Sequence, residues 1–131
     1  MGTATDRSEP AAHDDVPVLC IVDDDQGTRC LVRDVAEESG WAAVEFERIA
    51  DVRAYLVARR PTLLLIDDDL PDGRGGDLAR ELRQDPALAD VPTVVCTAAH
   101  PERRREIESW APVLSKPFEL SQFERHLASV R

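Results

Sequence analysis

The chain has 131 residues, the length of one ordinary domain with a core of its own. Its formal net charge of −10 argues against binding to nucleic acid or to an anionic membrane, and it favours a protein partner or a cation site. No apolar run is long enough to span a bilayer, and the amino terminus lacks the apolar segment of a signal peptide, so we expect a cytoplasmic protein.

The amino-terminal segment 1–16 mixes small, charged and proline residues without periodicity, which predicts a disordered tail ahead of a single domain over residues 17–131. The domain opens with a short apolar run, 18–22, that is typical of a buried strand and is followed directly by three carboxylates. The cysteines are odd in number and lack CxxC spacing, so we expect buried free thiols rather than disulfides or zinc ligands. They are Cys20, Cys30 and Cys96.

Helical and strand-like patterns then alternate. Residues 26–39 have apolar side chains at helical spacing, and Gly40 provides a C-terminal stop. Segment 41–46 is predicted to be an edge strand, and Asp51 is the predicted start of a second helix. The run 63–66 is apolar throughout, which is typical of a strand buried on both faces. The first helix is expected to bury Leu31, Val32, Val35 and Ala36.

The second half of the chain continues the alternation. Segment 71–76 is predicted to be a flexible loop before a third helix, and 91–96 is predicted to be another buried strand. A weak helix over 101–110 precedes a short strand at 113–114 and a last helix with its apolar face between 120 and 130. Five strand–helix pairs in strict order predict an α/β fold, with a parallel sheet covered by helices on both faces.

Polar side chains stand where four of the predicted strands end. Because the carboxyl ends of parallel strands meet at one edge of the sheet, we expect these side chains to be neighbours. Clustered carboxylates repel one another unless a cation joins them, and a hard divalent ion such as Mg²⁺ takes oxygen ligands. A carboxylate beside such an ion is suited to attack a phosphoryl group, which an ammonium and a hydroxyl would stabilise. Taken alone, the acids at 67–69 could equally cap a turn. The residues are Asp23, Asp24, Asp67, Thr97 and Lys116.

In this order and spacing, four pieces of the chain resemble the receiver domain of bacterial two-component response regulators. The resemblance covers about residues 16–131, and it implies a single-domain, doubly wound (βα)5 fold of the flavodoxin-like type with a five-stranded parallel sheet in the order 2-1-3-4-5. The pieces are Val22-Asp23-Asp24-Asp25, Ile66-Asp67-Asp68-Asp69-Leu70-Pro71-Asp72-Gly73, Cys96-Thr97-Ala98 and Ser115-Lys116-Pro117-Phe118.

The resemblance also implies a role for each matching residue. Asp67 would be the phosphoacceptor, Thr97 the switch hydroxyl, and Lys116 the partner of the phosphoryl group. The Lys116-Pro117 peptide bond would be cis. Mg²⁺, or Mn²⁺, would be held by Asp23, Asp24, Asp67 and the backbone carbonyl of Asp69.

The function that these features favour is that of a stand-alone response regulator in phosphorelay signal transduction. A histidine kinase or histidine phosphotransfer protein would donate a phosphoryl group to Asp67, and the added charge would alter contacts with a downstream protein through the fourth helix, fifth strand and fifth helix. We expect a phosphoprotein that assists its own phosphorylation and dephosphorylation, not a multiple-turnover enzyme. Neither nucleic acid nor a membrane is an expected partner.

Two departures from the family pattern bear on signalling. Val113 stands three positions before the lysine, where most members have an aromatic residue, and the segment between Thr97 and Lys116 is shorter than usual. An aromatic ring that swings inward is therefore not available. We expect either a shift of the fourth helix or a weakly coupled output.

Two other functions remain open. A docking module that keeps the fold without depending on phosphorylation is compatible with Val113. The basic run 103–105 would then contact a partner, although a solvated helix face is the commoner explanation. The Asp-x-Asp spacing at 67–69 also matches phosphatases of the haloacid dehalogenase type, but those enzymes have their nucleophile on the first strand and need more chain for a substrate pocket.

Overall fold

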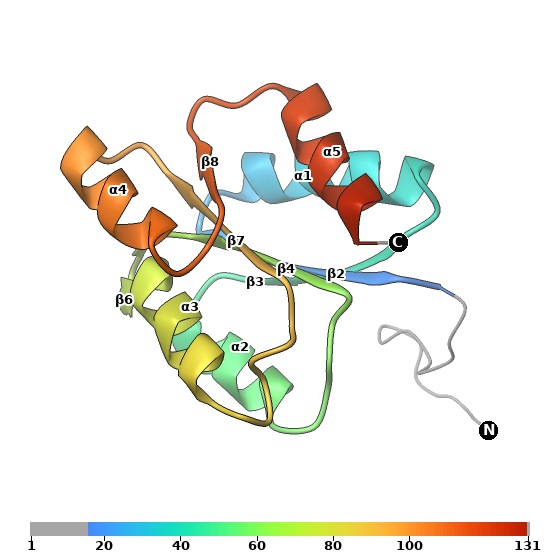
Figure 1. Ribbon diagram of the computed structural model, residues 1–131. Coiled ribbons are helices and arrows are strands. Elements are labelled where there is room, and N and C mark those ends of the chain that lie inside the picture. Colours follow the sequence, from blue (N-terminus) through green and yellow to red (C-terminus); the bar gives the residue numbers. More distant parts are fainter. Residues whose placement is uncertain (1–15, 131) are drawn as a thin grey trace.

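The computed structural model describes residues 16–130 and shows a five-stranded sheet whose strands all run parallel (Figure 1). Hydrogen-bonded neighbours lie in the order β3-β2-β4-β7-β8. Counted along the chain within this sheet, that is the order 2-1-3-4-5, so the predicted doubly wound flavodoxin-like fold is confirmed. The strands are β2 (Val18–Val22), β3 (Ala42–Phe46), β4 (Leu63–Asp67), β7 (Thr93–Thr97) and β8 (Val113–Ser115).

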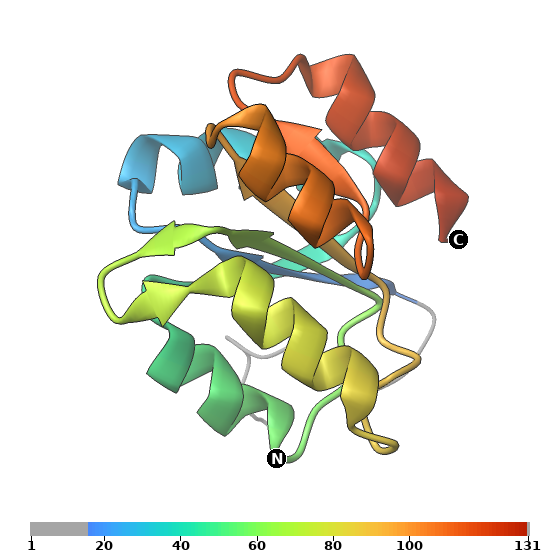
Figure 2. The same cartoon turned by 60° about the vertical axis from the view of Figure 1, so that its left-hand side comes forward.

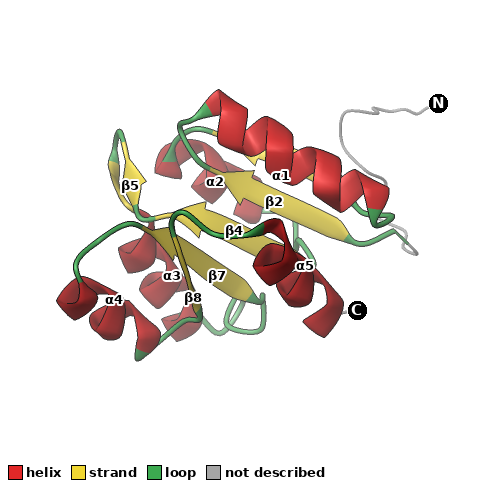
Figure 3. Cartoon of the chain, turned by 90° about the horizontal axis from the view of Figure 1, so that it is seen from above, coloured by secondary structure: helices red, strands yellow, loops and turns green. Residues whose placement is uncertain are grey.

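Helices cover both faces of the sheet, as the strict alternation of elements predicts (Figure 1). One face packs against α1 and α5, which Figure 3 shows lying over the sheet. The other face packs against α2, α3 and α4. The helices are α1 (Gln26–Glu38), α2 (Ile49–Leu56), α3 (Gly75–Gln84), α4 (Pro101–Glu108) and α5 (Leu120–Ser129).

The central strand β4 is buried along its whole length, as its unbroken apolar run predicts. Successive side chains of a strand point to opposite faces. Leu64 and Ile66 accordingly pack on the side of α2, α3 and α4, whereas Leu63 and Leu65 pack on the side of α1 and α5. This double-sided burial fixes β4 in the middle of the sheet and brings Asp67 to its carboxyl edge.

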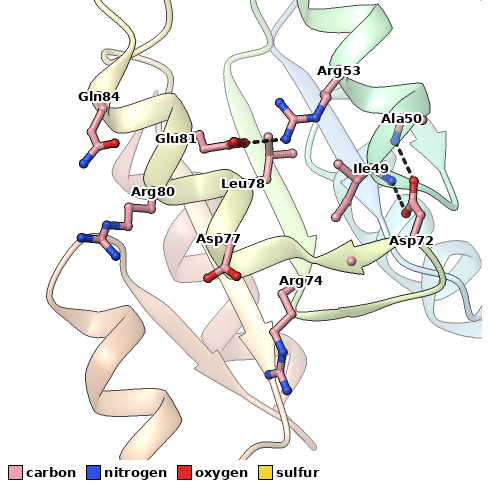
Figure 4. A pocket seen from close by; sticks show the side chains of 11 residues that line it. Ile49, Ala50, Arg53, Asp72, Arg74, Asp77, Leu78, Arg80, Glu81 and Gln84 are labelled. Atoms are coloured by element: carbon pink, nitrogen blue, oxygen red, sulfur yellow. Dashed lines mark hydrogen bonds and ion pairs between the residues drawn. The ribbon is translucent and has the colours of Figure 1, made fainter.

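The segment after β4 forms regular structure on either side of a turn, so the prediction of a loop over 71–76 was wrong. Strands β5 (Asp69–Leu70) and β6 (Gly73–Arg74) form an antiparallel hairpin that leads straight into α3 (Figure 2). At its turn, the Asp72 carboxylate accepts hydrogen bonds from the backbone N–H groups of Ile49, at 2.8 Å, and Ala50, at 3.0 Å (Figure 4). The hairpin is thereby tied to the start of α2.

The same contact explains why α2 does not begin at Asp51. The helix starts two residues earlier, at Ile49, and Asp51 lies in its first turn. Arg48 occupies the N-cap position without forming a side-chain cap, because the exposed N–H groups are satisfied by Asp72 from the hairpin. The cap therefore comes from a residue distant in sequence, which local sequence patterns do not reveal.

Some surface predictions also need correction. Leu31, assigned to the buried stripe of α1, is 50% exposed. Cys20 and Cys96 are buried free thiols as predicted, but Cys30 is exposed. The predicted tail falls outside the described residues except for Val16. Within residues 16–130, no helix is both long enough and apolar enough to cross a membrane.

Candidate functional site

The predicted polar residues lie along the carboxyl edge of the sheet. Asp67 and Thr97 are the last residues of β4 and β7, which are neighbours, and Asp23 follows β2, the neighbour of β4 on its other side. Lys116 follows β8, and its backbone N–H donates to the carbonyl of Thr97 at 2.9 Å. Four strands thus each bring one or two polar side chains to the same edge.

Three carboxylates and one ammonium form the centre of this site. One carboxylate oxygen from each of Asp23, Asp24 and Asp67 lies within 4.8 Å of the others. The Lys116 Nζ atom lies 3.1 Å from Oδ2 of Asp23 and 3.3 Å from Oδ2 of Asp67. Asp23 and Asp67 are buried, whereas Asp24 is exposed. The expected convergence of these four side chains is therefore present.

The environment of Asp67 makes its ionisation unusually costly. Burial, the larger effect, and the negative charge of Asp23 together raise the pKa of its carboxyl group to about 6, against the opposing effect of Lys116. Burial alone would lower the pKa of Lys116, but its hydrogen bond to Asp23 and the charge of Asp67 raise it above the usual value. At neutral pH the site therefore combines an ionised Asp67 with a protonated Lys116.

Asp25, the third of the three consecutive acids after β2, has a structural role. Asp25 caps α1, because its carboxylate accepts hydrogen bonds from the backbone N–H of Thr28, at 2.9 Å, and from the Thr28 hydroxyl, at 2.6 Å. Its own N–H donates to Oδ1 of Asp23 at 2.9 Å. Arg29 in α1 donates to the carbonyl of Asp23 at 2.7 Å. The start of α1 thus fixes the position of Asp23 within the cluster.

Thr97 and Asp69 contact the cluster through their backbones: the Thr97 carbonyl accepts from the Lys116 N–H, and a backbone hydrogen bond from Asp69 lowers the pKa of Asp67. The buried Thr97 hydroxyl accepts a hydrogen bond from the Ala99 N–H at 2.9 Å. Asp69 lies in β5 with its side chain exposed. The Lys116-Pro117 peptide bond is cis, as predicted.

Asp68 and Arg103 form a contact that the sequence patterns did not predict. Asp68 is buried, and its carboxylate binds Arg103 together with the Gly76 N–H. The side chain of Arg103 is only 16% exposed, so the expectation of a solvated face fails for this member of the basic run. The alternation of β4 contained the signal, since it directs Asp68 to the face opposite Asp67.

The donor set suits a hard divalent cation. One ammonium cannot neutralise three clustered carboxylates, and their oxygens lie close enough together to share an ion. Mg²⁺ prefers carboxylate oxygens, keeps several waters and is often completed by a phosphate oxygen. The cluster is therefore compatible with the predicted metal, Mg²⁺ or Mn²⁺.

Comparison with known families decides the class of this domain. Residues 19–128 match the family model of the response regulator receiver domain. The chain belongs to this family. Receiver domains bind Mg²⁺ in an acidic pocket and interact with histidine kinases or phosphotransfer proteins, which agrees with the type of site found here. The haloacid dehalogenase alternative is not favoured.

Receiver-type regulators are also the relatives found among curated proteins. The chain is 31% identical over 115 residues to the phosphate regulon transcriptional regulatory protein PhoB of Pseudomonas aeruginosa, covering 86% of this chain and 50% of that protein. It is 33% identical over 112 residues to the KDP operon transcriptional regulatory protein KdpE of Escherichia coli, covering 83% and 48%. The chain thus spans about half the length of these curated relatives.

Solved structures show the same fold. A receiver domain described as CheY-like from Methylobacillus flagellatus superimposes with a TM-score of 0.79 at 23% identity, covering 89% of this chain and 100% of the other. The chemotaxis response regulator CheY4 of Vibrio cholerae also gives 0.79, at 19% identity and with the same coverage. These likenesses establish the arrangement of strands and helices.

Proposed function

We propose that this receiver domain accepts a phosphoryl group on Asp67 from a histidine kinase or a histidine phosphotransfer protein. The observation that supports this most strongly is the placement of Asp67, a buried carboxylate 3.3 Å from the Lys116 ammonium and grouped with two further acids. Its pKa of about 6 leaves it ionised, and so nucleophilic, at neutral pH.

In the proposed transfer, an oxygen of Asp67 attacks the phosphorus of the donor's phosphohistidine. The new O–P bond forms as the P–N bond breaks, and the electron pair of that bond returns to the imidazole nitrogen. Lys116 is placed to meet the charge on the phosphoryl oxygens, and the Thr97 hydroxyl, which accepts from Ala99, retains its own proton for donation.

The metal has a defined place in this proposal. Asp23, Asp24, Asp67 and the backbone carbonyl of Asp69 would hold Mg²⁺ or Mn²⁺. When bound, the ion supplies positive charge that offsets the charge of the clustered acids and of the phosphoryl group. The resulting phosphoprotein is stoichiometric, not a multiple-turnover enzyme, and a cytoplasmic location and stand-alone action remain predictions.

We further propose that phosphorylation changes how the surface formed by α4, β8 and α5 contacts a downstream protein. Val113, at the position where an aromatic residue is usual, is half-buried and packs against the core cluster beneath α2, α3 and α4. Signalling here therefore uses a device other than a moving aromatic ring. Equal affinity of a partner for both forms would instead favour a docking module independent of phosphorylation.

Incubation with a small phosphodonor and Mg²⁺, followed by intact-mass measurement, tests the proposed function. The wild-type chain should gain the mass of one phosphoryl group, and Asp67→Asn should gain none. Asp34→Asn, a change of the same kind at an exposed position of α1, should react like the wild type. Equal labelling of Asp67→Asn and the wild type would rule the proposal out.

A further inference from the structure

Asp68, the residue after the proposed phosphoacceptor, is bound by an arginine from α4. Its side chain is buried, at 1% exposure of the residue, and its carboxylate receives two hydrogen bonds from one guanidinium. Arg103 Nε lies 3.1 Å from Oδ2, and Arg103 Nη2 lies 2.9 Å from Oδ1. This bidentate geometry fixes both the distance and the orientation of the arginine relative to the carboxylate.

The Asp68–Arg103 pair joins three elements of the fold. Arg103 Nη2 also lies 3.2 Å from Oδ1 of Asp77 in α3, and Nη1 lies 3.0 Å from Oε1 of Glu106 in α4. Oδ1 of Asp68 accepts a further hydrogen bond from the N–H of Gly76 at 3.0 Å. The pair therefore links the end of β4 to the first turns of α3 and α4.

The docking of α4 against α3 depends heavily on polar contacts. A Cβ atom at Gly76 would lie 2.8 Å from Oδ1 of Asp68 and 3.0 Å from Nη2 of Arg103, so the close approach requires glycine. Trp110, just beyond α4, donates from Nε1 to the carbonyl of Gly76 at 2.8 Å. Of the residues of α4, all of which the structure describes, only Ile107 is buried. Arg103 supplies the ion pairs that join this helix to Asp68 and to α3.

We propose that Arg103 is a positioning residue that couples occupancy of the Asp67 site to the docking of α4, an inference that rests on the proposed phosphorylation of Asp67. A phosphoryl group adds negative charge one residue away from Asp68. The guanidinium of Arg103 is then attracted more strongly, and α4 is held more firmly. Because coupling between two sites is reciprocal, loss of Arg103 weakens the binding of an anionic group at Asp67.

Beryllofluoride with Mg²⁺ tests this coupling, because it adds a negatively charged, phosphoryl-like group to a carboxylate. Its binding is followed by fluorine NMR, and the docking of α4 by amide hydrogen exchange over residues 101–108. In the wild-type chain, binding should slow exchange in α4. Arg103→Gln should weaken binding by about fivefold or more, the lower end of ordinary coupling between sites, and should lose most of the slowing.

Three further variants sharpen the test. Arg105→Gln is the matched control, because it removes the same charge from an exposed residue that forms no ion pair within residues 16–130. Arg103→Lys keeps the charge without the bidentate contact, so its loss of beryllofluoride binding should be intermediate. This variant replaces Arg103→Gln in the test if Arg103→Gln does not fold. The double variant Asp68→Asn/Arg103→Gln removes both charges together, and should recover binding without recovering the slowing of exchange.

The outcomes separate this inference from the function on which it rests. Failure of the wild-type chain to bind beryllofluoride contradicts the proposed function itself. Wild-type binding by Arg103→Gln, or equal losses in Arg103→Gln and Arg105→Gln, overturns the coupling and leaves phosphorylation of Asp67 untouched. Failure of the double variant to recover binding also overturns it, because the effect then does not arise from the paired charges.

Discussion

The Lys116 ammonium lies 3.3 Å from the carboxylate of Asp67, although β7 separates the strands that carry the two residues. The same nitrogen lies 3.1 Å from Asp23, which follows the strand on the far side of β4. One cation thus bridges acids from two neighbouring strands. The ionisation of Asp67 depends on that bridge.

Removal of the bridge should raise the pKa of Asp67. In Lys116→Met, burial and the charge of Asp23 act without an opposing cation, so the apparent pKa should exceed the value of about 6 expected for the wild type. Carboxyl ¹³C chemical shifts followed against pH in metal-free buffer measure it. Arg105→Met, at an exposed position of α4, should leave the titration unchanged. An unaltered titration in Lys116→Met would show that Lys116 does not control the site.

The free energy of unfolding should depend on pH through the ionisation of Asp67. Because its folded-state pKa of about 6 exceeds the ordinary value of 3.8, the folded chain binds this proton more tightly than the unfolded chain does. Ionisation of Asp67 therefore destabilises the fold. This destabilisation is complete above about pH 6 and is absent when the pH lies far below 3.8. Asp67→Asn should exceed the wild type in free energy of unfolding at pH 7, and the gap should narrow as the pH falls through this window. Urea unfolding with a chelator present measures this difference in free energy of unfolding. A difference that widens toward acid pH would contradict the prediction.

Divalent cations should stabilise the chain through the acid cluster. Mg²⁺ at one hundred times its dissociation constant should add about 2.7 kcal/mol to the free energy of unfolding. Asp24→Asn should lose most of this gain, because it removes one of the three clustered carboxylates. Thermal unfolding with and without Mg²⁺ checks this, with Asp34→Asn as the control. Equal stabilisation of Asp24→Asn and the wild type would place the ion elsewhere.

The cap that Asp72 provides for α2 should have a measurable effect on stability. Asp72→Ala leaves the first N–H groups of the helix without their carboxylate and should lower the free energy of unfolding. Asp51→Ala, within the first turn, should cost less, because Asp51 contributes only a favourable charge near the helix start. Chemical denaturation compares the two. A larger loss for Asp51→Ala would restore the helix start predicted from the sequence.

The sheet and the acid cluster could be predicted because their signals are local. The apolar run of β4 ends directly in Asp67, and that of β2 ends directly in Asp23, so predicting the strands also located the acids. The alternation of strands and helices required a parallel sheet, which places such strand ends at one edge.

Contacts between residues distant in sequence could not be predicted from local sequence patterns. Asp72 caps a helix 23 residues earlier, and Asp68 binds an arginine 35 residues later. Neither partner can be chosen from spacing, because the fold brings them together. These two contacts explain why the predicted start of α2 and the predicted solvated face for Arg103 were both wrong.

The central claim is that Asp67, and no other residue, accepts a phosphoryl group. The most direct measurement is peptide mass spectrometry after reaction with a small phosphodonor and Mg²⁺ and reduction with borohydride, which converts an aspartyl phosphate into homoserine. We expect homoserine at position 67 alone. Homoserine at another acidic position, with Asp67 intact, would contradict the account.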